Sequence, residues 1–146
     1  MTKKSIFDQL KGPYSVVVLD DEEGVAEVIE MYLDDHFGDE LIIKAFSDSE
    51  TAFEFIKEHR PHILVTDVRM PKISGDSLVH YCLDLFPNMQ IVVTTGDPSL
   101  TVKTNCYLDG AAGLIFKPIG PDAIVAMVQV CIDYFKRWEK IILNKK

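Results

Sequence analysis

Short apolar runs alternate along the chain with longer segments in which apolar residues recur at helical spacing. The runs are rich in Val, Ile and Leu and are typical of buried strands: residues 15–20, 41–46, 62–67, 90–95 and 113–116. The amphipathic segments predict helices over residues 25–37, from Ser47 or Ser49 to 60, through Leu85, over about 98–108, and from Pro121 onward. Because alternating strands and helices form parallel sheets covered by helices, the pattern predicts an α/β fold of five βα units.

Two helix ends carry residues that favour termination. Gly38 follows the first apolar stripe and is expected to end that helix. Ser47 or Ser49 is expected to cap the next helix, and Pro61 closes it. These residues place the helix boundaries without fixing the register of the sheet.

Length and composition suit one domain. A chain of 146 residues with 47% apolar content buries one core. We expect an N-terminal tail over residues 1–13, a domain over 14–132, and over 133–146 an extension of the last helix that serves as a connector or dimer arm. The net charge of −8 argues against direct nucleic-acid binding, and no apolar run approaches the length of a membrane span. Three scattered cysteines indicate neither a disulfide framework nor a zinc site, which favours a cytoplasmic location.

Polar side chains follow the predicted strands at their carboxyl ends. Asp20 and Asp21 come after the first strand, Asp67 ends the third, Thr95 ends the fourth, and Lys117 follows the fifth. In a doubly wound five-stranded sheet, ligands bind at this edge. Two carboxylates about 4 Å apart repel by roughly 4 kcal/mol at an effective dielectric near 20, and a hard divalent cation relieves that repulsion. The residues therefore predict a Mg²⁺ site, with Asp67 as the candidate nucleophile for phosphoryl transfer.

Four motifs in this order resemble the receiver domain of two-component response regulators. They are VVVLDDEE, ILVTDVRMP, VVTTG and LIFKP. The resemblance covers about residues 14–132 and implies a flavodoxin-like, three-layer (βα)₅ sandwich. It further implies a signalling domain that is no metabolic enzyme and that catalyses only its own phosphorylation and dephosphorylation.

The resemblance also implies roles for the acidic residues. Asp67 is expected to accept a phosphoryl group from the phosphohistidine of a sensor histidine kinase or a phosphotransfer protein. Asp21, Asp67 and the backbone carbonyl of Arg69 are expected to ligate Mg²⁺ directly, with Asp20 acting mainly through water. Arg69 and Asp97 lie two positions beyond Asp67 and Thr95, where they are expected to pair across the mouth of the site and affect the lifetime of the acyl phosphate.

Further roles concern the fourth and fifth strands. The resemblance implies that Thr95 bonds a phosphoryl oxygen, that Lys117 pairs with it, and that the peptide bond between Lys117 and Pro118 is cis. The chain departs from the family pattern at Leu114, where the family usually has a Tyr or Phe whose rotation reports phosphorylation. A leucine has no phenolic edge to exchange between burial and exposure, so the usual switch is in doubt.

The last helix carries an apolar seam at alternating four-and-three spacing that runs past the expected end of the domain: Ile124, Val128, Cys131, Phe135, Trp138 and Ile142. Its later members, Phe135, Trp138, Ile141 and Ile142, have no evident core to cover. A second set on this helix lies on a face that this family uses for dimers or partners: Ala123, Met127, Val130 and Tyr134. We expect a homodimer or partner interface here. In the alternative, the N-terminal tail covers the face with Ile6, Phe7 and Leu10.

Other readings of the chemistry stay open. A receiver-like scaffold can signal without phosphorylation, although intact Asp21, Asp67, Thr95 and Lys117 argue against it. A Mg²⁺ phosphatase of the haloacid dehalogenase kind needs a second Asp two residues after the nucleophile, where this chain has Arg69. The four histidines lack the spacing of metal ligands and are interpreted as structural or surface residues: His36, His59, His62 and His80. The three cysteines are interpreted as small apolar residues: Cys82, Cys106 and Cys131. Output is expected through a downstream protein or an output domain.

Overall fold

The computed structural model describes residues 9–143. Its strands are β1 (Tyr14–Leu19), β2 (Leu41–Phe46), β3 (Ile63–Asp67), β4 (Gln90–Thr95) and β5 (Gly113–Phe116). Its helices are α2 (Val25–Phe37), the short 3₁₀ helix η1 (Gly38–Glu40), α3 (Ser49–His59), α4 (Gly75–Leu85), α5 (Leu100–Asp109) and α6 (Pro121–Ile142). Every predicted strand and helix is present, and the predicted bounds differ from these by at most two residues.

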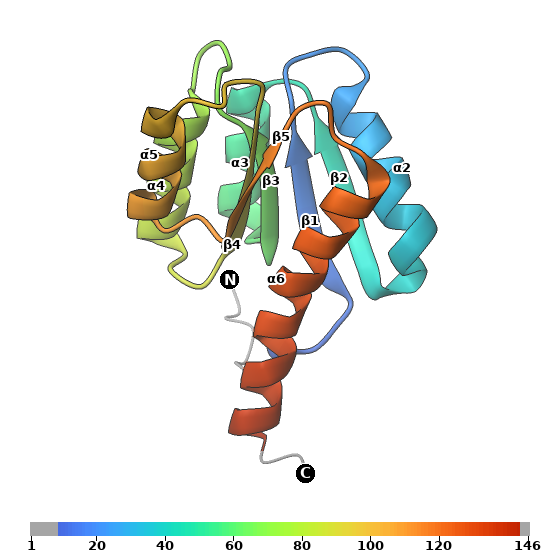
Figure 1. The fold of residues 1–146 in the computed structure, drawn as a ribbon. Coiled ribbons are helices and arrows are strands. Elements are labelled where there is room, and N and C mark those ends of the chain that lie inside the picture. The colour runs from blue at the N-terminus through green and yellow to red at the C-terminus, as the bar shows by residue number, and fades with distance from the viewer. Residues whose placement is uncertain (1–8, 144–146) are drawn as a thin grey trace.

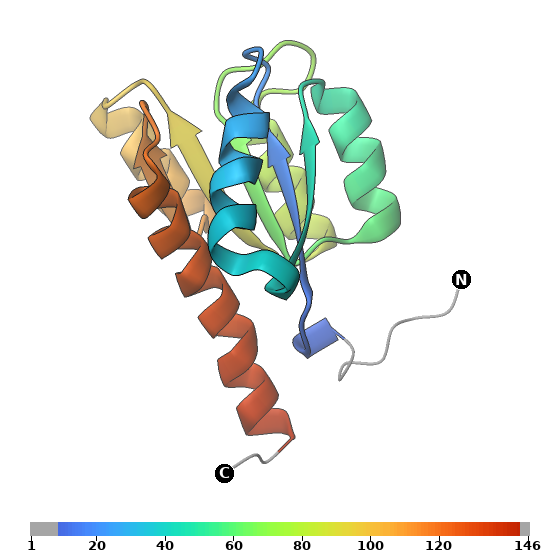
Figure 2. The same ribbon diagram turned by 90° about the vertical axis from the view of Figure 1, so that its right-hand side faces the viewer.

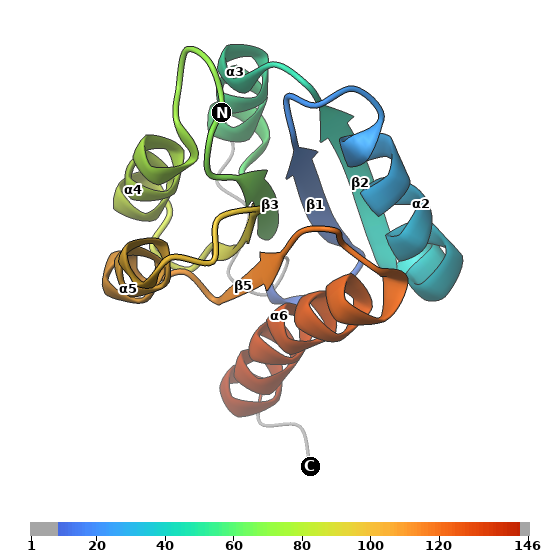
Figure 3. The same ribbon diagram turned by 45° about the horizontal axis from the view of Figure 1, so that its top comes forward.

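The five strands form one parallel sheet in the order β2-β1-β3-β4-β5. Helices α2 and α6 cover one face, and α3, α4 and α5 cover the other (Figure 1, Figure 3). The flavodoxin-like three-layer sandwich predicted from the sequence is therefore confirmed. The strand order reverses beside β1, so the crevice between the carboxyl ends of β1 and β3 is the place where such sheets bind ligands.

The core has two halves because the side chains of a strand point alternately to opposite faces. In β1, Val16 and Val18 pack under α2 and α6, whereas Val17 and Leu19 pack under α3, α4 and α5. All four side chains are at most 1% exposed. Burial on both faces explains why the central strands read as continuous apolar runs rather than as alternating patterns.

The caps of the helices agree in part with the sequence. Gly38 ends α2 with a φ of 52°, as expected. The prediction that Ser47 or Ser49 caps α3 is wrong, because the N-cap is Asp48. This residue has an extended backbone, and its Oδ2 accepts a hydrogen bond from the Thr51 amide at 2.8 Å. Ser49 is already the first helical residue, and its hydroxyl has a different use, described below.

The prediction that Phe135 lacks a core is wrong. Phe135 is 5% exposed, stacks on Tyr14 at 5.7 Å between ring centroids, and meets the edge of His62 at 5.0 Å. These partners come from the amino ends of β1 and β3, so α6 continues the core below the sheet (Figure 2). Burial is the main reason that the pKa of Tyr14 is raised to about 12.

The amino-terminal segment joins the same cluster. Leu10 is 8% exposed, and its carbonyl accepts a hydrogen bond from the Tyr14 hydroxyl at 3.0 Å. His62 accepts the Ser15 amide on Nδ1 at 3.0 Å and contacts the Gln9 carbonyl through Nε2 at 2.6 Å. The expected tail is thus packed on the domain from residue 9 onward, while Ile6 and Phe7 lie outside the described residues.

Beyond Phe135 the last turns of α6 leave the body of the domain (Figure 2). Trp138 is 42% exposed and Ile141 is 58% exposed, as the sequence predicted for a seam without a core. Earlier on the helix, Val130 is 57% exposed, and Cys131 is fully buried on the core side. None of the helices in residues 9–143 is long and apolar enough to cross a bilayer.

Candidate functional site

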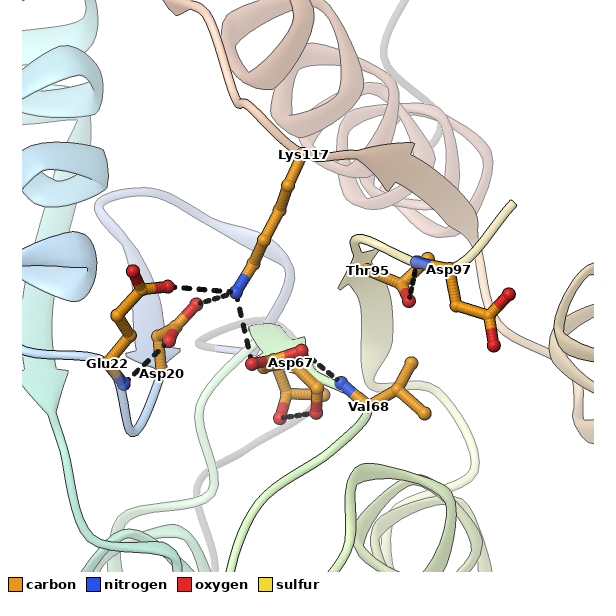
Figure 4. Close-up of polar contacts among 8 residues, drawn as sticks. Asp20, Glu22, Asp67, Val68, Thr95, Asp97 and Lys117 are labelled. Atoms are coloured by element: carbon orange, nitrogen blue, oxygen red, sulfur yellow. Dashed lines mark hydrogen bonds and ion pairs between the residues drawn. The ribbon is translucent and has the colours of Figure 1, made fainter. Parts of the chain in front are cut away.

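The residues predicted for the site converge at the carboxyl edge of the sheet. In the register of β1 and β3, Leu19 lies opposite Thr66, so the residues that follow them, Asp20 and Asp67, become neighbours. Lys117 follows the end of β5, and its side chain points toward both carboxylates (Figure 4). Parallel strands therefore bring together groups that are up to 97 positions apart in the sequence.

Asp20 is fully buried, which is unusual for a carboxylate. Its Oδ1 accepts a hydrogen bond from the Glu22 amide at 2.9 Å. Its Oδ2 lies 2.8 Å from Lys117 Nζ, yet no donor among residues 9–143 completes a directed hydrogen bond to this oxygen. A buried carboxylate oxygen without a hydrogen bond is costly unless a cation shares its charge.

Lys117 is the cation that the described residues supply. Its Nζ lies 2.8 Å from Asp20 Oδ2, 3.1 Å from Asp67 Oδ2 and 3.9 Å from Glu22 Oε2 (Figure 4). Burial acts to lower the pKa of Lys117, but the neighbouring carboxylates of Asp20 and Asp67 outweigh it and raise the pKa above its ordinary value. The lysine is thus protonated, and its positive charge lies within 3.1 Å of both carboxylates.

The three aspartates form a cluster of oxygen ligands. One carboxylate oxygen from each of Asp20, Asp21 and Asp67 lies within 4.8 Å of the others. Asp20 and Asp67 are buried, whereas Asp21 is exposed and opens the cluster to solvent. The donor set fits Mg²⁺, which takes a few carboxylates and keeps its remaining positions for water and phosphate oxygens. The oxygen of Asp20 that lacks a hydrogen bond supports this fit.

Asp67 is held in place by its own loop. Its Oδ1 accepts a hydrogen bond from the Val68 amide at 2.8 Å, while Oδ2 faces Lys117. The side chain is buried but still borders a pocket of about 490 Å³ that also contains Thr95 and Lys117. Helix α4 begins against the backbone of this residue, because a Cβ built on Gly75 falls only 2.1 Å from the Asp67 carbonyl oxygen.

Thr95 and Asp97 form the opposite wall of the pocket. The Thr95 hydroxyl accepts a hydrogen bond from the Asp97 amide at 3.0 Å, and its side chain is 2% exposed. The expected pair is present: Arg69 Nη2 lies 2.6 Å from Asp97 Oδ2. Hydrogen bonds from Ser99 are the main reason that the pKa of Asp97 is lowered, and Arg69 adds to the effect. The pair lies at the border between the pocket and a second hollow beside α5.

Leu114 lies on β5, the strand that pairs with the Thr95 strand β4. It is half-buried on β5 opposite Val93 and packs on the core beneath α3, α4 and α5. Two residues further, Phe116 is paired with Thr95 in the sheet and is 42% exposed, with Lys103 Nζ 5.5 Å from its ring centre. The peptide bond before Pro118 is cis, as the resemblance implied.

The remaining predicted residues lie elsewhere. The set on α6, from Ala123 to Trp138, belongs to a helix that runs away from the acidic edge and past the opposite end of the sheet (Figure 1). None of the histidines in the described part of the chain joins a cluster of potential metal ligands. All three cysteines are free and buried, in agreement with a structural role.

Several residues at this edge were missed. Glu22 donates its amide to Asp20 and places a third carboxylate near Lys117, and Gly75 permits the close approach of α4 to Asp67. Ser49 and Lys72 bind the β3–α4 loop to α3, as described below. Gly75, the first residue of α4, is a sequence signal for a close approach of two backbones. The contacts of Ser49 depend on tertiary structure alone.

Comparisons with known proteins agree with this geometry. The sequence model of the response regulator receiver domain matches residues 16–129. The regulatory protein YesN of Bacillus subtilis, described as an uncharacterized transcriptional regulator, is 30% identical over 85% of this chain and 34% of its own length. The response regulator Rre1 of a Synechocystis species is 27% identical over 80% of this chain and 51% of its own.

Solved structures show the same fold. The receiver domain of a putative LuxO repressor protein from Vibrio parahaemolyticus superposes with a TM-score of 0.79 at 20% identity, covering 88% of this chain and 96% of that one. The matched part of this chain covers between a quarter and about half of the length of the curated relatives that it resembles. The family model matches most of the chain, including the residues of the acidic edge. The chain therefore belongs to the response regulator receiver domain family.

Proposed function

We propose that this domain is phosphorylated on Asp67 by a sensor histidine kinase or a phosphotransfer protein and that Mg²⁺ is required. The observation that carries the proposal is the convergence of Asp20, Asp21 and Asp67 with Lys117 at one edge of the sheet. The family acts as a phosphorylation-controlled signalling switch, and these residues supply the chemistry that such a switch needs.

In the transfer step, a carboxylate oxygen of Asp67 attacks phosphorus and the bond from phosphorus to the histidine nitrogen breaks. The new P–O bond gives an acyl phosphate, and the imidazole leaves with the electron pair of the broken bond. The Val68 amide orients Asp67 through Oδ1, and Lys117 provides positive charge beside Oδ2. Phosphoryl transfer is largely a matter of such positioning and charge stabilisation.

The metal would be held by Asp20, Asp21 and Asp67, together with the backbone carbonyl of Arg69. A bound Mg²⁺ supplies positive charge against the transferring phosphoryl oxygens. The chain needs this charge, because among the described residues one lysine faces the three aspartates of the cluster and Glu22. Lys117 then exchanges its contact with Asp67 Oδ2 for a phosphoryl oxygen.

Thr95 completes the proposed binding of the phosphoryl group. Its oxygen accepts the Asp97 amide, so its own O–H is directed to another acceptor, and the phosphoryl group supplies one. Movement of Thr95 toward the phosphoryl group would loosen its contact with Asp97 and thereby affect the ion pair with Arg69. With Leu114 in place of an aromatic residue, the switch relies on packing changes in this wall rather than on a rotating ring.

We further propose that α6 carries the output, as a homodimer interface or through contact with a downstream protein or output domain. Val130 and Trp138 are exposed, whereas Tyr134 is half-buried and donates its hydroxyl to Asn88 Oδ1 at 3.3 Å. Exposed apolar faces of this kind mark interfaces. Sedimentation of the phosphorylated and unphosphorylated chain at high concentration tests the dimer, and a monomer in both states would count against it.

The decisive test is intact mass after incubation with acetyl phosphate and Mg²⁺. We expect the gain of one phosphoryl group, absent from an Asp67→Asn variant and absent when a chelator removes the metal. No gain in the native chain would favour a scaffold that signals without phosphorylation. A haloacid dehalogenase-like phosphatase has no support, because Arg69 occupies the position of its second aspartate and the family match is to receivers.

A further inference from the structure

The loop from Val68 to Ser74, which follows Asp67, is fastened to a helix that precedes it in the sequence. At its two ends the loop is closed by backbone contacts: the Val68 amide donates to the Thr94 carbonyl at 3.2 Å, and the Gly75 amide donates to the Val68 carbonyl at 2.7 Å. Its middle, residues 69–73, includes the carbonyl of Arg69 that is expected to hold Mg²⁺. The hydrogen bonds to this middle part come from side chains.

Ser49 makes two of these hydrogen bonds with one hydroxyl. Its Oγ donates to the Pro71 carbonyl at 2.8 Å and accepts from the Ile73 amide at 3.1 Å. Ser49 is the first residue of α3 and is 3% exposed, so water does not compete for these contacts. A buried hydroxyl that uses both its proton and its lone pair fixes two loop residues in one arrangement.

Beside it, Lys72 forms a second tether. Lys72 Nζ lies 2.6 Å from Asp48 Oδ1, while the other oxygen of Asp48 caps α3 through Thr51. The hydrogen bond to Lys72 is the main reason that the pKa of Asp48 is lowered. Lys72 has a φ of 69°, a left-handed backbone that a non-glycine residue adopts only where contacts hold it. Neighbouring residues of α3 thus hold Pro71, Lys72 and Ile73.

We propose that Ser49 is a positioning residue for the metal site, supported by the pair of Lys72 and Asp48. By holding residues 71–73, Ser49 fixes the loop that carries the Arg69 carbonyl before Mg²⁺ arrives, so less ordering is needed on binding. The inference rests on the proposed function, because it assumes that Mg²⁺ binds beside Asp67. Neither Ser49 nor Lys72 contacts the metal or the phosphoryl group in this assignment.

The test compares Mg²⁺ affinity, measured by isothermal titration calorimetry, in the native chain and in Ser49→Ala. Outer partners of metal ligands typically change metal affinity by about 10- to 100-fold, and for this more distant residue we expect a dissociation constant raised about 3- to 10-fold. At saturating Mg²⁺ the rate of phosphorylation by acetyl phosphate should return to the native value. Hydrogen exchange of the Ile73 amide should become faster, since its acceptor is gone.

Two further variants separate positioning from other effects. Lys72→Gln keeps the Cβ and the backbone but removes a positive charge near the site, which by electrostatics alone would tighten Mg²⁺ binding. Weaker binding in Lys72→Gln therefore supports the tether, also if Ser49→Ala does not fold. Ala52→Gly destabilises α3 from a buried position that makes no hydrogen bond to the loop through its side chain, and it should leave the affinity unchanged.

The outcomes are distinct. If the native chain binds no Mg²⁺, the proposed function fails and not the tether alone. If the native chain binds Mg²⁺ and Ser49→Ala binds it equally well, the positioning role is overturned. Equal weakening in Ser49→Ala and Ala52→Gly would assign the effect to general loss of stability and would also overturn the proposal, as would tighter binding in Lys72→Gln.

Discussion

Replacement of Gly75 by alanine tests how closely α4 is set against the phosphoacceptor. A Cβ at this position falls 2.1 Å from the Asp67 carbonyl oxygen, 2.6 Å from Val68 Cα and 2.9 Å from the Asp67 carbonyl carbon. All three are backbone atoms, so no flexible side chain gives way. Ordinary contact begins at about 3.4 Å, so the start of the helix must retreat by about 1.3 Å or push Asp67 out of line.

The cost follows from these contacts. Overpacking of this kind costs about 1–3 kcal/mol, and loss of the hydrogen bond from the Gly75 amide to Val68 adds about 1 kcal/mol. Alanine recovers at most about 1 kcal/mol through its helix propensity, and less at the first residue of α4. We therefore expect the free energy of unfolding to fall by about 2–3 kcal/mol, together with slower phosphorylation of Asp67.

The assay is urea unfolding followed by far-ultraviolet circular dichroism, with Gly120→Ala as the matched control. Gly120 is the N-cap of α6, one residue before the helix begins; it has a φ of −90°, and a Cβ there meets nothing within 4 Å. Its replacement should cost at most about 1 kcal/mol, the usual range for an N-cap. Equal stability of the two variants would refute the claim that α4 is packed against the backbone of Asp67.

Three more outcomes follow from the packing and the pocket. Phe135→Ala should lower the free energy of unfolding by about 3–5 kcal/mol in the same urea assay, whereas Trp138→Ala should change it by at most about 0.5 kcal/mol; a similar effect of both would contradict the burial of Phe135. Absorbance at 295 nm should show a tyrosine that titrates near pH 12 and disappears in Tyr14→Phe, and because the pKa of Tyr14 is raised in the folded state, stability should fall as pH rises from 10 to 12. Arg69→Ala should speed dephosphorylation by up to about fivefold, because an exposed ion pair with Asp97 is worth at most about 1 kcal/mol; an unchanged rate in a phosphate-release assay would remove the pair from control of acyl-phosphate lifetime.

Most of the fold could be predicted because the sequence separates strands from helices so clearly. The predicted bounds of β2, β4 and β5 match the structure, since each is a Val- or Ile-rich run between turn residues. Helix α5 starts two residues later than predicted, at Leu100, because the Ser99 side chain accepts the Val102 amide and so caps the helix there. Ser99 is a cap signal that the sequence contains, whereas the prediction begins the helix at about Pro98.

The centre of the candidate site was predictable for a related reason. Asp20, Asp67, Thr95 and Lys117 each stand at the end of a strand, and a parallel sheet brings such positions to one edge. The supports around them were not predictable, because the contact of Ser49 with Pro71 joins the first residue of α3 to a loop 22 positions away, and no periodicity fixes how that loop meets the helix. These outer contacts are set by tertiary structure and not by local pattern.

The burial of Phe135 on α6 has a consequence for signalling. Helical spacing identified Phe135 as part of a seam, but its partners Tyr14 and His62 come from the other end of the chain, so no local pattern announced a core there. Because Phe135 is locked into the domain, the turns that follow it inherit the orientation of the sheet. A rearrangement at the carboxyl edge that shifts α6 would be carried as a rigid-body movement to Trp138 and Ile141, whose exposed side chains are placed to meet a partner. An output surface at the far end of α6 thus needs no contact with the phosphorylation site, only a helix that is packed on the domain as far as Phe135 and exposes Trp138 and Ile141 beyond it.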